Sequence, residues 1–192
     1  RYLACYDDSM LVWALIGLAV GSFLNVLVYR LNEKKAPKFW QGRSRCPNCN
    51  HNLSWQDNIP LLSFIILAGR CRYCKKKISW QYPIVELTSA AVTLLAFPNI
   101  FIVLLSYCFI VIFFSDLIYG LIPTEMIIFG MLVGLVWHNV LTALFSGFGF
   151  WLVVKITRGR GLGGGDILLA ILMGWVLGWP KVLVAFWSAF II

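Results

Sequence analysis

Two aspartates border long apolar segments in a chain of 192 residues that has only eight Asp and Glu. Asp166 follows three glycines and opens an apolar run, whereas Asp116 ends one. An ionisable side chain beside hydrocarbon is costly, and such residues usually serve a function. An acid that opens a helix can also be a simple N-cap favoured by the helix dipole, while an acid at a helix end opposes that dipole. Taken one at a time, each aspartate is therefore compatible with either role.

A pair of aspartates that meet at one depth of a membrane has a specific chemistry. Two carboxylates at close range share one proton, so that one acts as an acid and the other as a base. The base activates water against an amide carbonyl and the acid protonates the departing nitrogen, with both roles belonging to the pair. The nearby glycines would let a peptide backbone approach Asp166 closely; they are Gly161, Gly163, Gly164 and Gly165. A phosphate-binding loop is disfavoured, because no strand precedes these glycines and no Lys-Ser/Thr follows them.

Four cysteines form two CxxC pairs with 21 residues between the pairs: Cys46, Cys49, Cys71 and Cys74. Each CxxC turn delivers two thiolates to one ion, so the pattern predicts a zinc site, although the gap is one residue beyond the usual range. Four protein ligands leave no position for water, and the predicted metal is therefore structural. The alternative is two disulfides, which would need an oxidising compartment. Cys5 and Cys108 lie far from this cluster and are expected to be unpaired.

The composition excludes an ordinary soluble domain. The chain is 60% hydrophobic and only 12% charged, with a mean hydropathy of +0.83. A soluble protein of this size needs more polar surface, and several apolar runs approach membrane-spanning length. We therefore predict an all-α polytopic membrane protein with a small zinc-binding loop domain. The first span is not a cleavable signal peptide, because Asp7 and Asp8 stand where a basic region should lie.

The apolar and polar segments alternate along the chain. We expect a first span over about 10–29, a polar segment over 30–80, two spans between Pro83 and Asp116 that turn at Pro98, and a polar elbow over 119–125. Further spans are expected over about 126–144, from a return turn at Gly147–Gly149 to Lys155, over 166–177, and from near Lys181. The expected domains are a first helix over 1–30, a zinc-binding domain over 31–80 and a helical peptidase core over 81–192. The last span offers only about 20 Å of helix for a hydrocarbon core of about 30 Å, so the chain is expected to be truncated at its C-terminus.

Positive charge predicts the orientation. The segment 30–80 holds eleven of the sixteen Lys and Arg, which places it in the cytoplasm by the positive-inside rule. Alternating spans then put Asp116 and Asp166 at the cytoplasmic ends of their helices, and Lys155, Arg158 and Arg160 agree with this topology. The net charge of +8 is accordingly a topology signal, and no nucleic-acid partner is expected.

The motif Gly163-Gly-Gly-Asp166 is similar to the GxGD motif of intramembrane-type aspartic proteases. The rest of the chain resembles the type IV prepilin peptidases, the bifunctional leader peptidases and N-methyltransferases of type IV pilus, competence and type II secretion systems. The matching segments are 21–31, 46–49, 58–63, 69–74, 82–86 and 174–179. The chain departs from the family pattern where a proline, an acid and a lysine are common, at Asn32, Thr124 and Leu168.

The resemblance implies a function and a place. Asp116 and Asp166 correspond to the catalytic aspartates of an enzyme in the bacterial inner membrane, and the substrate is a prepilin or pseudopilin whose basic leader is cut on the cytoplasmic side after a glycine. The four cysteines resemble the bifunctional branch, which methylates the new N-terminus with S-adenosylmethionine. No residue is assigned to methyl transfer. Glu86 is a candidate with packing as its alternative, and Asn25 is expected to hydrogen-bond between helices.

The residues themselves are also compatible with two other classes of protein. A membrane adaptor would use the zinc module to dock a partner and the aspartates as caps. A proton-coupled transporter would carry protons on the aspartates, although it would need them near the bilayer midplane and not at one face.

Overall fold

The computed structural model describes residues 2–33, 42–159 and 162–191, and it divides into two compact units, 1–118 and 119–192. The regular structure of the described residues is helical, and their β-structure is limited to two isolated bridges, Arg45 with Asn52 and Arg70 with Lys77. The predicted all-α class is confirmed. The three domains expected from the sequence stay a prediction.

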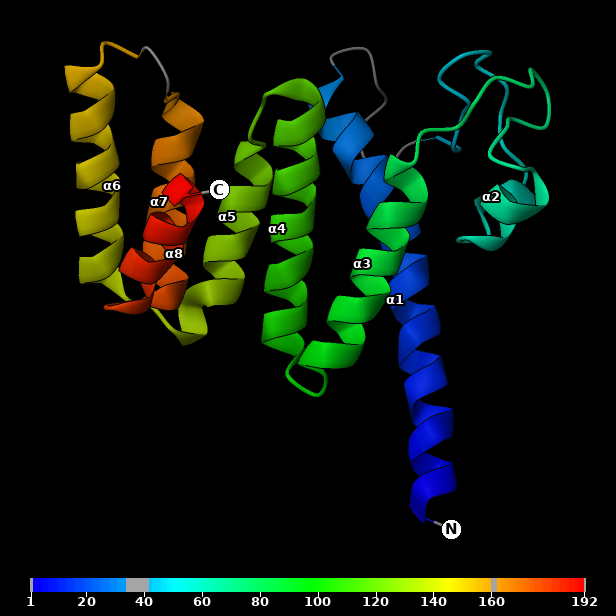
Figure 1. The fold of residues 1–192 in the computed structure, drawn as a ribbon, viewed down its shortest axis with the longest axis horizontal. Coiled ribbons are helices and arrows are strands. Elements are labelled where there is room, and N and C mark those ends of the chain that lie inside the picture. The colour runs from blue at the N-terminus through cyan, green and yellow to red at the C-terminus, as the bar shows by residue number, and fades with distance from the viewer. Residues whose placement is uncertain (1, 34–41, 160–161, 192) are drawn as a thin grey trace. The chain divides into compact units, whose positions relative to one another are not determined.

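The first unit is built on three helices, α1 (Tyr2–Asn32), α3 (Gln81–Ala96) and α4 (Ile100–Tyr119). A polar segment between α1 and α3 carries a 3-10 turn, η1 (Trp55–Asn58), and the short helix α2 (Leu62–Ile66). Helices α1 and α3 lie side by side (Figure 1). The chain turns between α3 and α4 at Phe97–Asn99, so the predicted break at Pro98 is confirmed.

Two glycines one helical turn apart bring α1 against α3. A Cβ added at Gly17 would lie 2.6 Å from the Cα of Ala90, and one added at Gly21 would lie 2.7 Å from the Cα of Glu86. Small residues at this spacing let helix backbones approach closely, which is a common way of packing helices in membranes. The two glycines therefore set the distance between α1 and α3.

Replacing Gly21 with alanine is expected to destabilise the first unit by about 1–3 kcal/mol, because the added methyl group overlaps backbone that has no rotamer to change. Gly149→Ala is the matched control, since no atom of the described residues meets a Cβ added there within 4 Å, and alanine is the better helix former. Thermal unfolding of the purified protein in one detergent measures both. Equal midpoints for the two variants would contradict the close packing.

Helix α4 joins the other two helices through buried hydroxyl groups. The hydroxyls of Thr93 and Tyr107 lie 2.6 Å apart between α3 and α4. The side-chain amide of Asn32 at the end of α1 donates to the hydroxyl of Ser115, at 2.8 Å. Ser115 is fully buried, directly before Asp116. The C-terminal ends of α1 and α4 are thus linked beside the first of the two aspartates.

The second unit contains α5 (Thr124–Val133), the 3-10 turn η2 (Gly134–Val136), α6 (Val140–Ile156), α7 (Gly164–Leu177) and α8 (Lys181–Ile191). Helix α7 packs along α6, and the two are adjacent in Figure 1. A Cβ at Gly174 would lie 2.7 Å from the carbonyl oxygen of Thr142, so this contact depends on glycine.

The span predicted over 126–144 and the return turn predicted at Gly147–Gly149 are wrong. The chain turns earlier, around His138, which has a φ of +26°, and α6 then runs through both glycines. The break is held by Asn139, whose side-chain amide donates to the carbonyl of Trp175 at 3.2 Å. Gly147 serves packing instead of turning, because an added Cβ would lie 2.5 Å from the Cγ1 of Ile171.

Two helical segments, Met10–Asn32 and Ile100–Tyr119, are long and apolar enough to cross a membrane. Three shorter apolar helical segments follow them, Thr124–Val136, Val140–Ile156 and Gly164–Leu177. The number of spans and their orientation stay predictions.

Candidate functional site

Asp116 lies in the last turn of α4, at the end of the first unit. Its side chain is exposed, and it forms no hydrogen bond or ion pair with the described residues of the chain. The hydroxyl of its neighbour Ser115 accepts a hydrogen bond from the side-chain amide of Asn32. The backbone at Asp116 is therefore held in place while its carboxylate stays available.

Asp166 lies in the first turn of α7, in the second unit. Its Oδ2 accepts a hydrogen bond from the backbone N–H of Gly163 at 2.6 Å, so the carboxylate, at the third residue of α7, caps the start of the helix. Gly163 and Gly164 are exposed. Among the described residues beyond their chain neighbours, the one atom within 4 Å of a Cβ added at either is the Oδ2 of Asp166, 3.8 Å from the Cβ added at Gly163. The backbone beside Asp166 is thus open to an approaching chain.

The other predicted glycines of this loop differ from those two. A Cβ at Gly165 would lie 3.1 Å from the Cβ of Ile122, so Gly165 packs against the elbow before α5. Gly161 lies outside the described residues. Asp116 and Asp166 belong to different units, and their meeting as a pair stays a prediction.

The four predicted cysteine ligands converge: the sulfur atoms of Cys46, Cys49, Cys71 and Cys74 all lie within 4.8 Å of one another. The sulfurs of Cys46 and Cys74 are 3.9 Å apart. A tetrahedral zinc ion with Zn–S bonds of about 2.3 Å separates its sulfurs by about 3.8 Å, so this donor set fits such an ion. All four are free thiols, which contradicts the two-disulfide alternative. Cys108 is a buried free thiol, as predicted, and the side chain of Cys5 lies outside the described residues.

The backbone turns at the two knuckles match each other. The N–H of Cys46 donates to the carbonyl of His51, and the N–H of Asn50 donates back to Cys46. In the second pair, Cys71 and Lys76 make the corresponding bond, and Lys75 donates back to Cys71. Repetition of one turn in both pairs explains why the CxxC spacing alone could predict this cluster.

The protonation of these thiols is uneven. Burial raises the pKa of Cys71, but hydrogen bonds from backbone N–H groups of its own knuckle and from neighbouring thiols outweigh it and lower that pKa to about 7. At Cys49 the backbone of His51 lowers the pKa, whereas desolvation and the thiols of Cys46 and Cys74 raise it to about 11. Of these two thiols, Cys71 therefore loses its proton more easily. Cys49 needs a bound cation to ionise near neutral pH.

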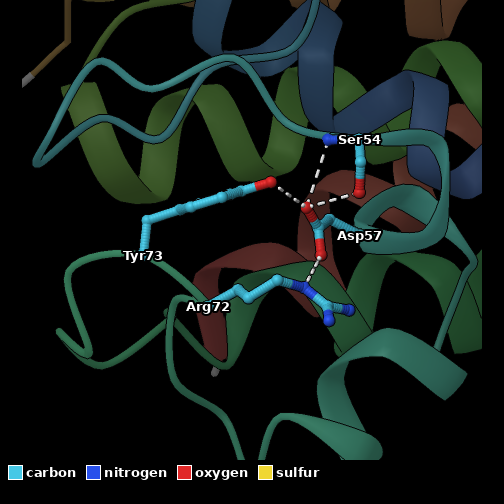
Figure 2. Close-up of polar contacts among 4 residues, drawn as sticks. All are labelled: Ser54, Asp57, Arg72 and Tyr73. Carbon is cyan, nitrogen blue, oxygen red and sulfur yellow. Dashed lines mark hydrogen bonds and ion pairs between the residues drawn. The ribbon is translucent and has the colours of Figure 1, made fainter.

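Asp57 links the two halves of the polar segment (Figure 2). Its carboxylate accepts hydrogen bonds from the backbone N–H and the hydroxyl of Ser54, at 3.1 and 2.8 Å. It also accepts from Arg72 at 2.7 Å and from the hydroxyl of Tyr73 at 3.3 Å, both within the second knuckle. Asp57 was not predicted as a structural residue, although the Ser-x-x-Asp spacing at 54–57 is a known capping pattern.

Asp57→Asn is expected to lower the stability of the folded polar segment by about 1–2 kcal/mol, because it removes charge-assisted hydrogen bonds whose Arg72 end is partly screened by water. Burial raises the pKa of Asp57, but Arg72 and Ser54 outweigh it and hold the pKa below its usual range. The stabilisation is therefore complete above the unfolded-state pKa of about 4 and is lost as the pH falls below it.

The check is chemical unfolding of the wild type and Asp57→Asn at pH 6 and pH 8. We expect the same difference at both values. If the free-energy difference between the wild type and Asp57→Asn grew between pH 6 and pH 8, a group other than the Asp57 carboxylate would be responsible for the stabilisation.

Glu86 and Asn25 tie the polar segment and the helices together. Glu86 is 6% exposed, and its Oε2 accepts a hydrogen bond from the backbone N–H of Leu61 at 2.8 Å. Asn25 is 3% exposed and donates to the carbonyl of Tyr82 at 3.1 Å, which confirms its predicted role between helices. The contact between Glu86 and Leu61 was not predicted, because nothing in the local sequence joins these positions.

Comparison with known families covers nearly the whole chain. Residues 15–100 match the family described as Bacterial Peptidase A24 N-terminal domain, and residues 102–192 match the Type IV leader peptidase family. The second match contains both aspartates, and the first contains the four cysteines. The chain belongs to the type IV prepilin peptidase family.

Curated relatives agree with this family. The chain is 33% identical to the prepilin leader peptidase/N-methyltransferase of Myxococcus xanthus, covering 88% of this chain and 56% of the relative. It is 31% identical to the enzyme of that name from Aeromonas hydrophila, and the match covers 88% of this chain and 73% of the relative. It is 33% identical to the type 4 prepilin-like proteins leader peptide-processing enzyme of Escherichia coli, and the match covers 92% of this chain and 81% of the relative. The chain thus spans little more than half the length of the Myxococcus relative, and no solved structure matches it.

Proposed function

We propose that the protein is a membrane aspartic endopeptidase that removes the basic leader of type IV prepilins or pseudopilins on the cytoplasmic side. The observation that carries this proposal is the match of residues 102–192 to the Type IV leader peptidase family, which includes Asp116 and Asp166. The names of the curated relatives support a prepilin as the substrate class.

The two aspartates are proposed to act as one acid–base pair. The ionised member takes a proton from water, which attacks the peptide carbonyl, and the protonated member donates to the leaving nitrogen. The open backbone at Gly163 and Gly164 supports this role for Asp166, because an extended peptide can approach without meeting a side chain. The bond from Gly163 to Asp166 fixes the direction of the carboxylate.

A multi-pass position in the bacterial inner membrane is part of the proposal. Large apolar side chains are exposed on several of the helices, including Leu95 on α3, at 86%, and Leu141 and Phe145 on α6, at 73% and 77%. Such side chains suit a lipid environment, and the basic segment 42–80 suits the cytoplasmic face. A prepilin leader that precedes an apolar helix would then reach the aspartates from within the bilayer plane.

The cysteine cluster is proposed to hold one structural Zn²⁺ through Cys46, Cys49, Cys71 and Cys74. Four thiolate ligands suit zinc and leave no open coordination position, so the metal would stabilise the fold of the segment. Methylation of the new N-terminus with S-adenosylmethionine is the second proposed activity. It is supported by the N-methyltransferase names of the relatives.

The test is a mass measurement on a prepilin-like peptide that carries a basic leader, a glycine and an apolar segment. Purified protein is expected to release the leader whether or not S-adenosylmethionine is added. The mature fragment should gain one methyl group only when the donor is present. Folded, zinc-loaded protein that leaves the peptide intact would overturn the proposed peptidase.

A further inference from the structure

The short helix α2 exposes an apolar face. Leu62, Ile65 and Ile66 share this face, because the two isoleucines follow Leu62 by three and four residues, and each side chain is at least 50% exposed. Trp55 of η1 extends the face, since it lines a shallow groove with Leu62 and Ile66 and is 74% exposed. We call these four residues the α2 patch. A contiguous apolar patch on the surface of a polar segment marks an interaction site.

Another side of α2 is packed within the same segment. The ring of Phe64 lies 5.1 Å from the ring of Trp80, measured between centroids. Phe64 also contacts the turn at Gly69, where an added Cβ would lie 3.2 Å from its ring. The helix is therefore fixed on the side of Phe64, and the α2 patch is held facing away from these contacts.

The start of α2 is held beside the first candidate span, Met10–Asn32. The backbone N–H of Leu61 donates to Glu86 on α3 at 2.8 Å, and Glu86 lies against Gly21 of α1, where an added Cβ would be 2.7 Å from its Cα. Gly21 is about 16 Å before the end of that span, at 1.5 Å per residue. Residues of α1 between 19 and 30 also line one cavity with the cysteine-bearing segment. The segment therefore lies alongside the C-terminal half of the span and not beyond its end.

The cysteine-bearing segment has a strong positive charge. Residues 42–80 contain seven Lys and Arg and a single acid, Asp57, which is paired with Arg72. Five of the basic residues follow α2 and are exposed: Arg70, Arg72, Lys75, Lys76 and Lys77. Arg72 also lines the groove beside Trp55, so positive charge adjoins the α2 patch. This charge repels a second copy of the segment and the basic leader of a prepilin, and it attracts anionic lipid headgroups.

We propose that the α2 patch docks on the cytoplasmic face of an anionic phospholipid bilayer, with α2 in the plane of the interface. The apolar side chains reach the acyl chains while the basic residues contact headgroup phosphates, as in other amphipathic interfacial helices. Trp55 and Trp80 suit this place, because tryptophan favours the interface between lipid and water. The inference rests on the proposed membrane position of α1. Docking holds the cysteine-bearing segment at the surface where the leader of a membrane-bound substrate lies.

Photocrosslinking of the full chain in lipid vesicles tests the docking. The photoreactive residue p-benzoyl-phenylalanine is placed at Ile65 or Ile66 in the patch, at Asn48 as the matched control, or at Leu15, and the adducts are identified by mass. Asn48 is exposed in the same segment but lies outside the α2 patch, and Leu15 is exposed on the candidate span of α1. Zinc content and thermal unfolding report whether each variant is folded.

The expected yields depend on position and on lipid charge. In vesicles of dioleoyl-phosphatidylglycerol, Ile65 and Ile66 should each give at least about fivefold more lipid adduct than Asn48. In vesicles of neutral dioleoyl-phosphatidylcholine, the yield at the two patch positions should fall at least about threefold, because the basic residues lose their headgroup partners. The yield at Leu15 should be the same in both lipids.

The outcomes separate the docking from the proposed function. Lipid adducts at Leu15 but at neither patch position, or equal yields at Asn48 and the patch, would overturn the docking and leave the membrane position of α1 in place. Patch adducts with a second copy of the chain, or with an added prepilin-like peptide instead of lipid, would assign the patch to a protein partner and overturn the docking as well. Absence of lipid adducts at all positions would contradict the membrane position itself. Leader cleavage by the wild type tests the peptidase independently of these results.

Discussion

Asp116→Asn and Asp166→Asn are each expected to lower the rate of leader cleavage by about 10³-fold or more while leaving the zinc content unchanged. Positioned proton transfer contributes about 10²–10⁴-fold to a rate, and an amide can neither take the proton from water nor deliver one to the leaving nitrogen. The pair acts as a unit, so loss of one member removes the function of both. The measurement is the initial rate of peptide cleavage, followed by mass.

The controls address folding and alternative functions. Glu33→Gln makes the same kind of change at an exposed acid that is not a member of the proposed pair and should cleave at the wild-type rate. The side-chain oxygen of asparagine can accept the same hydrogen bond from the N–H of Gly163, so Asp166→Asn is expected to keep this capping contact of α7 while removing the acid. A variant that cuts at the parental rate would mean that its aspartate is not catalytic. If both variants did so, the adaptor, in which the aspartates are caps, would be the better explanation.

The sequence predicted the cysteine cluster but missed the turn at His138, and the difference has a physical cause. Each CxxC knuckle is a local turn, so its shape can be predicted from neighbouring residues. The cluster then depends on a single long-range contact, the one between the two knuckles. The break around His138 depends on the bond from Asn139 to Trp175, which joins residues far apart in sequence. Gly147 misled the prediction because glycine serves both turns and close helix contacts, and here it packs on Ile171.

The candidate site divides in the same way. The glycines and Asp166 are neighbours in sequence, so the capping bond from Gly163 could be predicted from the pattern. The contact of Glu86 with Leu61 could not, because it depends on how the polar segment folds back on α3. The pairing of Asp116 with Asp166 is of this second kind. It follows from the resemblance to the family and from no local pattern.

Cys46→Ser combined with Cys71→Ser is expected to abolish zinc binding under conditions in which the wild type holds one zinc per chain. Structural zinc sites are worth about 10–16 kcal/mol, so each of four thiolates contributes about 3 kcal/mol, and losing two lowers the affinity by about 10⁴-fold. Both residues are buried, at 6% and 5% exposed, so the cluster is also part of the packing of this small segment. Zinc analysis measures the first effect, and limited proteolysis within residues 42–80 measures the second.

The matched control is Cys108→Ser, which changes a cysteine outside the cluster and should keep the metal. A double variant that retains one zinc per chain would show that the ion has other ligands, and a zinc-free preparation with unchanged protease resistance would show that the metal is not structural.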